Sequence, residues 1–199
     1  MRCPVCQSPL SEGAQQCPAC AFSLDKADVV FGASPILDAQ CTDLAGVLSD
    51  RDERKIRATL ALLARHFPQV QVSIVLEHLR PGVPLGAYTF WLFNRGNLAQ
   101  PITSGGDCQL ILFVVDAREL HLSCMVGYGL EPLLREEALQ EIVAIADPSL
   151  KEHHYAEGLL LALQRLDKEL RLTSQLIPRA FGLHHEEADA DEDASEYLF

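Results

Sequence analysis

Four cysteines near the start of the chain form two CxxC pairs, and these are the strongest chemical signal in the sequence. Cys3 and Cys6 stand in CPVC, Cys17 and Cys20 stand in CPAC, and ten residues separate the pairs. Each pair can form a tight turn that directs two sulfurs to one centre, and two such turns complete a tetrahedron. The four cysteines therefore predict a zinc site. Because four thiolates leave no position open for water or substrate, we expect a structural site rather than a catalytic one.

The segment around these cysteines resembles the short zinc ribbons that open many prokaryotic proteins. Such ribbons often carry glycine after the second cysteine of each pair, whereas Gln7 and Ala21 stand there in this chain. We therefore expect some backbone strain in both turns. Disulfides are the alternative, but the first residues lack the apolar run of a signal peptide, which predicts a reducing, cytoplasmic location. The ribbon is expected to bind another protein.

Composition restricts the classes of partner. The 199-residue chain has 48% hydrophobic and 22% charged residues, as in folded globular proteins, and a formal net charge of −12. This charge argues against a nucleic-acid partner, because duplex binding needs clustered Lys and Arg. No apolar stretch is long enough to predict a membrane span. Seven carboxylates without a Lys or Arg lie between Glu186 and Glu196, which predicts a disordered acidic tail.

Hydrophobic periodicity predicts an α/β domain after the ribbon. Helical stripes and strand-like runs alternate along the chain, and one strand is apolar throughout, which indicates a sheet between helical layers. The expected helices are 50–67, 84–97, 132–146 and 154–171, and the expected strands are 69–76, 109–115 and 119–126. The last two strands are expected to form an antiparallel hairpin around a turn at 116–118. The predicted division is a zinc ribbon (1–24), a linker (25–35), the α/β domain (36–175) and the acidic tail (176–199).

The predicted hairpin brings acidic residues together. Gly105-Gly106-Asp107 leads into its first strand, and Gly127-Tyr128-Gly129 leads out of its second, so both junctions lie at one end of the sheet. Asp107 should therefore face Glu131 and Glu136. Converging carboxylates favour a hard cation such as calcium or magnesium, which could polarise a phosphate ester and activate water. The alternative is ordinary loop chemistry for Asp107 and helix-dipole partners for the glutamates.

Four motifs carry a resemblance to the TPM domain family, over about residues 36–172. DLAGVLS (43–49) is similar to the family's opening Asp-x-Ala-Gly-x-Leu-Ser, and GGD (105–107) to its central loop. VGYGLE (126–131) resembles its most recognisable stretch, and HYAEGLLLAL (154–163) fits its final helix. The resemblance implies a three-layer α/β/α sandwich with an acidic pocket at one end. Some family members are described as acid phosphatases, and some bind calcium.

The same resemblance implies that Asp43, Asp107 and Glu131 are the inherited acidic positions, with Asp107 and Glu131 as the catalytic candidates. This chain departs from the family where Cys108-Gln109 follow Asp107 and where Leu134-Arg135-Glu136 replace Leu-Thr-Asp. Arg135 adds a cation beside the proposed pocket. Two functions therefore remain open. We favour a non-enzymatic protein-binding or assembly module. The alternative is a phosphatase that depends on calcium or magnesium, in which four carboxylates hold the cation: Asp43, Asp107, Glu131 and Glu136.

Overall fold

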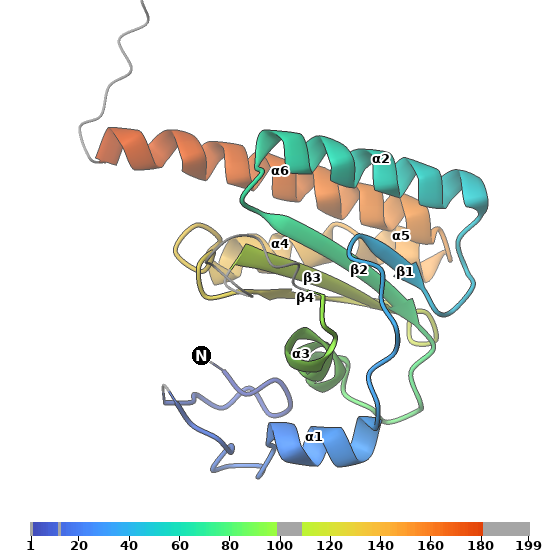
Figure 1. Cartoon of the computed structure of the whole chain (residues 1–199), viewed down its shortest axis with the longest axis vertical. Helices are drawn as coiled ribbons and strands as arrows, with labels where there is room; N and C mark the ends of the chain where they lie inside the picture. Colours follow the sequence, from blue (N-terminus) through green and yellow to red (C-terminus); the bar gives the residue numbers. More distant parts are fainter. Residues whose placement is uncertain (1, 12, 99–108, 181–199) are drawn as a thin grey trace, which may run out of the picture.

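The structure is a computed structural model that describes residues 2–11, 13–98 and 109–180. Within this part of the chain, a β-sheet lies between two layers of helices, and the cysteine-rich segment lies beside one of these layers (Figure 1). The expected three-layer α/β/α sandwich with a small N-terminal cysteine-rich unit is therefore confirmed. None of the helices in the described ranges is both long and apolar enough to span a bilayer.

Four strands of the described chain form the sheet, in the order β1-β2-β3-β4. β1 (Cys41–Asp43), β2 (Gln71–Glu77) and β3 (Leu110–Asp116) run parallel, and β4 (His121–Val126) returns antiparallel to β3. Every residue of β3 is buried, as its continuous apolar run predicts for a strand covered on both faces. The predicted antiparallel hairpin is confirmed.

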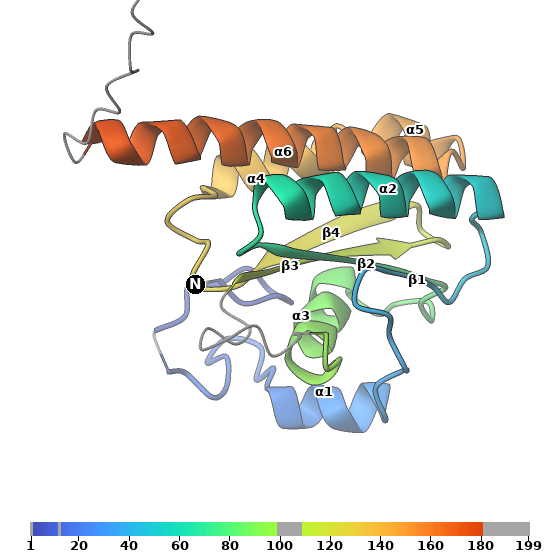
Figure 2. The same cartoon turned by 45° about the horizontal axis from the view of Figure 1, so that its top comes forward.

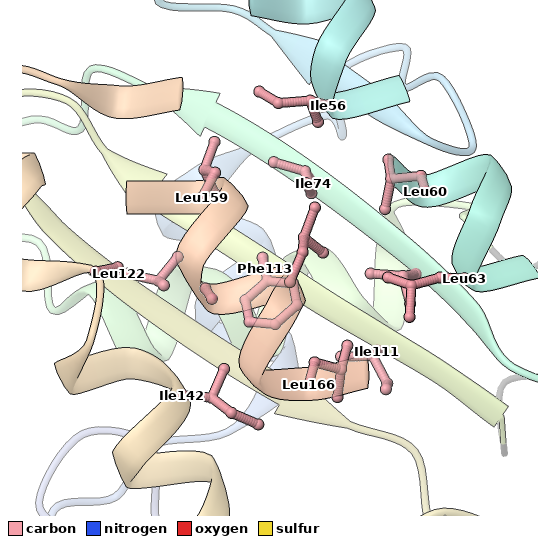
Figure 3. Close-up of a cluster of buried hydrophobic side chains, with 14 of the residues drawn as sticks. Ile56, Leu60, Leu63, Ile74, Ile111, Phe113, Leu122, Ile142, Leu159 and Leu166 are labelled. Atoms are coloured by element: carbon pink, nitrogen blue, oxygen red, sulfur yellow. The ribbon is translucent and has the colours of Figure 1, made fainter. Parts of the chain in front are cut away.

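The first helical layer consists of α2 (Asp50–His66), α4 (Glu136–Ala144), α5 (Asp147–Lys151) and α6 (Tyr155–Ala180). α2 and α6 lie side by side over the sheet (Figure 2). Their apolar stripes meet the sheet in the larger core, where Phe113 of β3 is central (Figure 3). The buried helical residues of this core include Ile56, Leu60, Leu63, Leu159, Leu163, Leu166 and Leu170, as the stripes predicted.

The second layer consists of α3 (Leu85–Arg95) and α1 (Leu24–Phe31), which lie below the opposite face of the sheet (Figure 2). A second core fills the space between these two helices and the sheet, and Trp91 is its largest fully buried side chain. α1 occupies most of the segment that was predicted as a linker (25–35).

Two predicted boundaries differ from the structure in the C-terminal half. The helix expected from Pro132 begins at Glu136, because residues 127–134 form turns that bury Leu130 and Leu134 in the core. The same helix ends at Ala144 rather than at the predicted Ala146, and Pro148 in the first turn of α5 has no N–H to donate to the Ala144 carbonyl. α4 and α5 are therefore two separate helices.

The hairpin turn and the final helix are longer than predicted. Asp116 still pairs with His121, so the turn spans residues 117–120 rather than 116–118. Leu120 closes it with a φ of 59°, in the left-handed region. α6 continues to Ala180, so the first five residues of the predicted tail are helical. The acidic run itself lies outside the described residues.

Candidate metal centre

The four cysteines of the ribbon lie close together. The sulfurs of Cys3 and Cys20 are 3.6 Å apart, as are those of Cys6 and Cys17, and all four lie within 4.8 Å of one another. Four sulfurs bound at about 2.3 Å to one tetrahedral ion would be separated by about 3.8 Å. The spacing therefore fits one four-coordinate metal ion. Among the described residues, this is the cluster of His, Cys, Asp and Glu side chains that could hold a metal.

Each cysteine pair forms the expected tight turn, closed by a backbone hydrogen bond. The Gln7 N–H donates to the Cys3 carbonyl at 3.0 Å, and the Ala21 N–H donates to the Cys17 carbonyl at 2.8 Å. The two donating residues have φ values of 60° and 58°, in the left-handed region that favours glycine. The strain expected at Gln7 and Ala21 is therefore confirmed.

The pKa values of two of the four thiols are shifted in opposite directions. Hydrogen bonds with the side chain and the backbone of Ser8 lower the pKa of the Cys6 thiol to about 6. At Cys20 the backbone N–H of Phe22 acts in the same direction, but desolvation and the three neighbouring sulfurs outweigh it and raise the pKa to about 12. A bound dication would supply the positive charge that lets all four thiols ionise.

The ribbon packs directly onto α3. A Cβ added at Gly86 would lie 2.7 Å from the Pro4 carbonyl oxygen, so the close approach of the two backbones requires glycine. Next to this contact, the rings of Phe22 and Phe90 meet edge to face with centroids 5.8 Å apart. The ribbon and the α/β domain therefore share a packed interface.

α1, which follows the ribbon in the chain, also packs against α3. The Trp91 indole N–H donates to Asp28 at 2.9 Å, and the Arg95 guanidinium donates to both oxygens of the same carboxylate at 2.8 to 3.2 Å. The hydrogen bond from Arg95 lowers the pKa of Asp28, and the one from Trp91 adds to the effect. The Phe31 ring packs against the Trp91 ring, with centroids 5.2 Å apart. These contacts fix α1 on α3.

A cavity of about 460 Å³, which we call the ribbon hollow, lies where the ribbon, α3 and β4 meet. Its lining includes Arg2 of the ribbon, Phe90 and Phe93 of α3, Met125 of β4, and Glu131. This cavity was not predicted from the sequence. The available signal was the pair of phenylalanines, because they lie beside the buried residues Tyr88, Trp91 and Leu92 and indicate a helix covered on more than one side.

Asp43 closes the loop that follows β1. Its Oδ1 accepts the Gly46 N–H at 2.8 Å, and its Oδ2 accepts the Leu48 N–H at 2.7 Å. Because β1 runs parallel to β3, Asp43 lies at the end of the sheet where β3 finishes. Glu131 follows β4, at the end where β3 begins. The structure therefore separates Asp43 from Glu131, and the expected four-carboxylate site does not include Asp43.

Glu131 and Glu136 lie together beyond the other end of the sheet. The Gly127 N–H donates to the first residue of β3 at 2.8 Å, so the junction after β4 adjoins the start of β3, as the hairpin geometry predicts. Glu131 lines the ribbon hollow, and a Glu136 oxygen lies 3.7 Å from Arg2 Nε. Asp107 lies outside the described residues, so its meeting with these glutamates remains a prediction.

Another aspartate that the sequence analysis did not single out anchors the end of the sheet near Asp43. Asp116 is only 3% exposed, and its Oδ1 accepts the N–H groups of Leu79 and Arg118 at 3.3 and 2.9 Å. A separate cavity of about 540 Å³ nearby is lined by His153 and Tyr155. An aspartate before a turn carries no signal that distinguishes a loop anchor from a ligand, so the sequence could not reveal this role.

The α/β part of the chain has known relatives. The family model of the TPM domain matches residues 41–169, from the first strand to α6. The NMR structure of BA42 from the psychrophilic bacterium Bizionia argentinensis has a TM-score of 0.54 and 11% identity, over 63% of this chain and 83% of that one. This likeness supports the fold.

Two further NMR structures are less similar in shape. The N-terminal domain of cg2496 from Corynebacterium glutamicum gives a TM-score of 0.49 at 16% identity, over 83% of this chain and 95% of its own. The N-terminal domain of a P. gingivalis protein gives a TM-score of 0.48 at 23% identity, over 73% of this chain and 85% of that one. Comparison with curated protein sequences finds no match. The family match covers more than half of the residues, and the chain belongs to the TPM domain family.

Proposed function

We propose that Cys3, Cys6, Cys17 and Cys20 bind one structural zinc ion, and that the ribbon and the TPM domain together form a non-enzymatic module that binds a protein partner. The cytoplasm is the expected location, because a reducing compartment keeps the thiols available to the metal. The observation that carries the proposal is the packed interface between the ribbon and α3, which adds a ribbon wall to the surface of the TPM domain.

The ligand set supports zinc. Four thiolates with sulfurs 3.6 Å apart in each close pair suit a tetrahedral ion, and zinc combines that geometry with a preference for sulfur. Cys3 and Cys17 are buried, whereas Cys6 and Cys20 are exposed, so the ion would lie between the ribbon interior and solvent. A closed site of this kind stabilises a fold and offers no coordination position for a reaction.

The acidic residues support binding rather than hydrolysis. Both oxygens of Asp43 hold the loop after β1, and Glu136 faces Arg2. The first interaction gives a structural role to one of the four carboxylates considered for a cation, and the second places a positive charge beside another. The net charge of −12 favours a protein partner over a nucleic acid.

The zinc site is tested by the metal content of the purified chain. We expect one zinc ion per wild-type chain, loss of this zinc in Cys17→Ser, and full retention in the matched control Cys41→Ala, which removes a buried thiol outside the ribbon. Absence of zinc from the wild type, or its retention in Cys17→Ser, would overturn this part of the proposal.

The binding surface is tested with a photo-crosslinking amino acid. Tyr128 lines the ribbon hollow and is 63% exposed, whereas Leu62 of α2 is 53% exposed on the outer surface. In extracts we expect a discrete protein adduct from position 128 that disappears when zinc is removed, and none from position 62. Equal labelling from both positions, or none from either, would contradict the proposed binding module.

The second candidate function is metal-dependent phosphate-ester hydrolysis, which Glu131 favours because it lines a cavity next to the start of β3. Hydrolysis of a generic aryl phosphate with and without calcium or magnesium separates the two functions. The binding module predicts no metal-stimulated turnover. Metal-dependent turnover that is lost in both Asp107→Ala and Glu131→Gln would establish the phosphatase instead.

A further inference from the structure

β4 forms one edge of the sheet. β3 occupies one of its sides, and within the described ranges no strand pairs with the other side. The hydrogen bond from Gly127 to β3 and the observed register identify Met125 and Ser123 as the residues whose backbone groups bond to β3. Cys124 and Val126 alternate with them. Their N–H and C=O groups therefore point toward the free edge.

The ribbon hollow runs along this free edge. Its lining includes every residue from 123 to 127. Because the side chains of Cys124 and Val126 pack against the larger core, these two residues present their backbone to the hollow. Phe90 and Phe93 of α3 lie on the opposite wall. An unpaired strand edge beside an apolar wall has the features of a surface to which an extended peptide adds as a further strand.

The charges around the hollow favour a basic partner. Arg2 is engaged by Glu136, so Glu131 is the carboxylate of the lining for which the described residues provide no ion-pair partner. Cys3 also lines the hollow, and four thiolates around one zinc ion would carry a net charge of −2. A Lys or Arg of a bound peptide would therefore meet a negative potential at the ribbon end of the hollow.

We propose that the free edge of β4 binds an extended segment of a partner protein, in which apolar side chains alternate with Lys or Arg. The segment adds as a strand, bonds to the backbone of Cys124 and Val126, and directs its apolar side chains toward Phe90, Phe93 and Met125. This inference rests on the proposed function, because it specifies the partner of the same surface.

The experiment starts from a random dodecapeptide library displayed on phage and selected on the full zinc-loaded chain. We expect the enriched peptides to be basic with alternating apolar residues. The best peptide is then synthesised with a fluorescent label. Two further versions are N-methylated at alternate residues, one at the odd positions and one at the even positions. N-methylation keeps the side chains and the charge but removes strand pairing, so we expect binding at least about tenfold weaker in one of the two methylation registers.

Variants of the chain locate the binding site. Val126→Pro removes an outward N–H that β3 does not use, and Phe93→Ser alters the apolar wall, so both should weaken binding about tenfold or more. Glu131→Gln should weaken it about threefold, whereas the matched control Glu119→Gln, in the turn at the far end of β4, should not. Amide resonances of Cys124 and Val126 should shift on peptide binding.

The outcomes separate this inference from the proposed function. Peptides that bind Val126→Pro and Phe93→Ser as tightly as the wild type would overturn the strand-addition site and leave a binding module intact. Failure to enrich any peptide, while Tyr128 still crosslinks a protein, would overturn the extended-peptide partner alone. Loss of both results would overturn the proposed function as well. If Val126→Pro does not fold, Phe93→Ser and the N-methylated peptides decide the question.

Discussion

Replacing Ala21 by glycine should tighten zinc binding, because this residue closes its turn at a φ of 58°. A side chain in the left-handed region costs about 1–2 kcal/mol, which the substitution removes. The greater freedom of glycine in the unfolded chain offsets about 0.5–1 kcal/mol of this stabilisation. The net stabilisation is about 0.5–1 kcal/mol. Since the ribbon is expected to fold with its metal, zinc affinity should rise about two- to fivefold. Gln7→Gly should act in the same way, and the effects should add in the double variant.

The assay is competition for zinc with a chromophoric chelator at fixed pH. Ala14→Gly is the matched control, because it makes the same chemical change in the ribbon at a residue outside the positive-φ set. It should weaken zinc binding by about 0.5–1 kcal/mol through the entropy of the unfolded chain. If Ala21→Gly weakens zinc binding as much as Ala14→Gly does, the strain assigned to the cysteine turns is refuted.

Three further predictions test the roles assigned to single residues. Asp43→Ala should lower the free energy of unfolding by about 1–2 kcal/mol, because the half-buried Leu48 N–H and the exposed Gly46 N–H lose their acceptor, and it should leave any thermal shift caused by calcium unchanged. Gly86→Ala should displace the Pro4 carbonyl and speed hydrogen exchange in the ribbon, at a cost of about 1–3 kcal/mol, and unchanged exchange would contradict the packed interface. Arg95 and Trp91 lower the pKa of Asp28 in the folded chain. Their stabilisation of the folded state is therefore fully present above the unfolded value of 3.8 and is lost as pH falls through the lower folded pKa. Fluorescence of Trp91, the single tryptophan, should therefore change below about pH 4 in the wild type, and this acid transition should be absent from Asp28→Asn.

Elements with strong local signals could be predicted from the sequence. α2 has a capping Ser49 and a regular apolar stripe, and β3 has a run of apolar residues that only a buried strand explains. β1 is three residues long, too short for its alternation to be recognised. α1 has a capping Ser23 and ends at Gly32, but it is only eight residues long, and a helix this short depends on tertiary contacts such as that of Asp28 with Trp91, so its local signals were not sufficient to predict it.

The same distinction applies to the sites. The cysteine cluster could be predicted because each CxxC pair is a local motif, and its two strained turns followed from Gln7 and Ala21. The ribbon hollow could not, because it combines three segments that are far apart in the chain. The separation of Asp43 from Glu131 depends on the parallel register of β1 and β3, which motif order along the chain does not determine.

Through the glycine contact between the ribbon and α3, the proposed zinc ion would also affect how much of the folded chain a cell maintains. Without its ion, the ribbon would lose the turns that hold Pro4 and Phe22 against α3. The phenylalanines of that helix would then be exposed to solvent. Bared aromatic surface is what chaperones and proteases recognise in immature proteins. Zinc loading would therefore act as a maturation checkpoint, and a cell short of zinc would be expected to clear this protein rather than accumulate an inactive form.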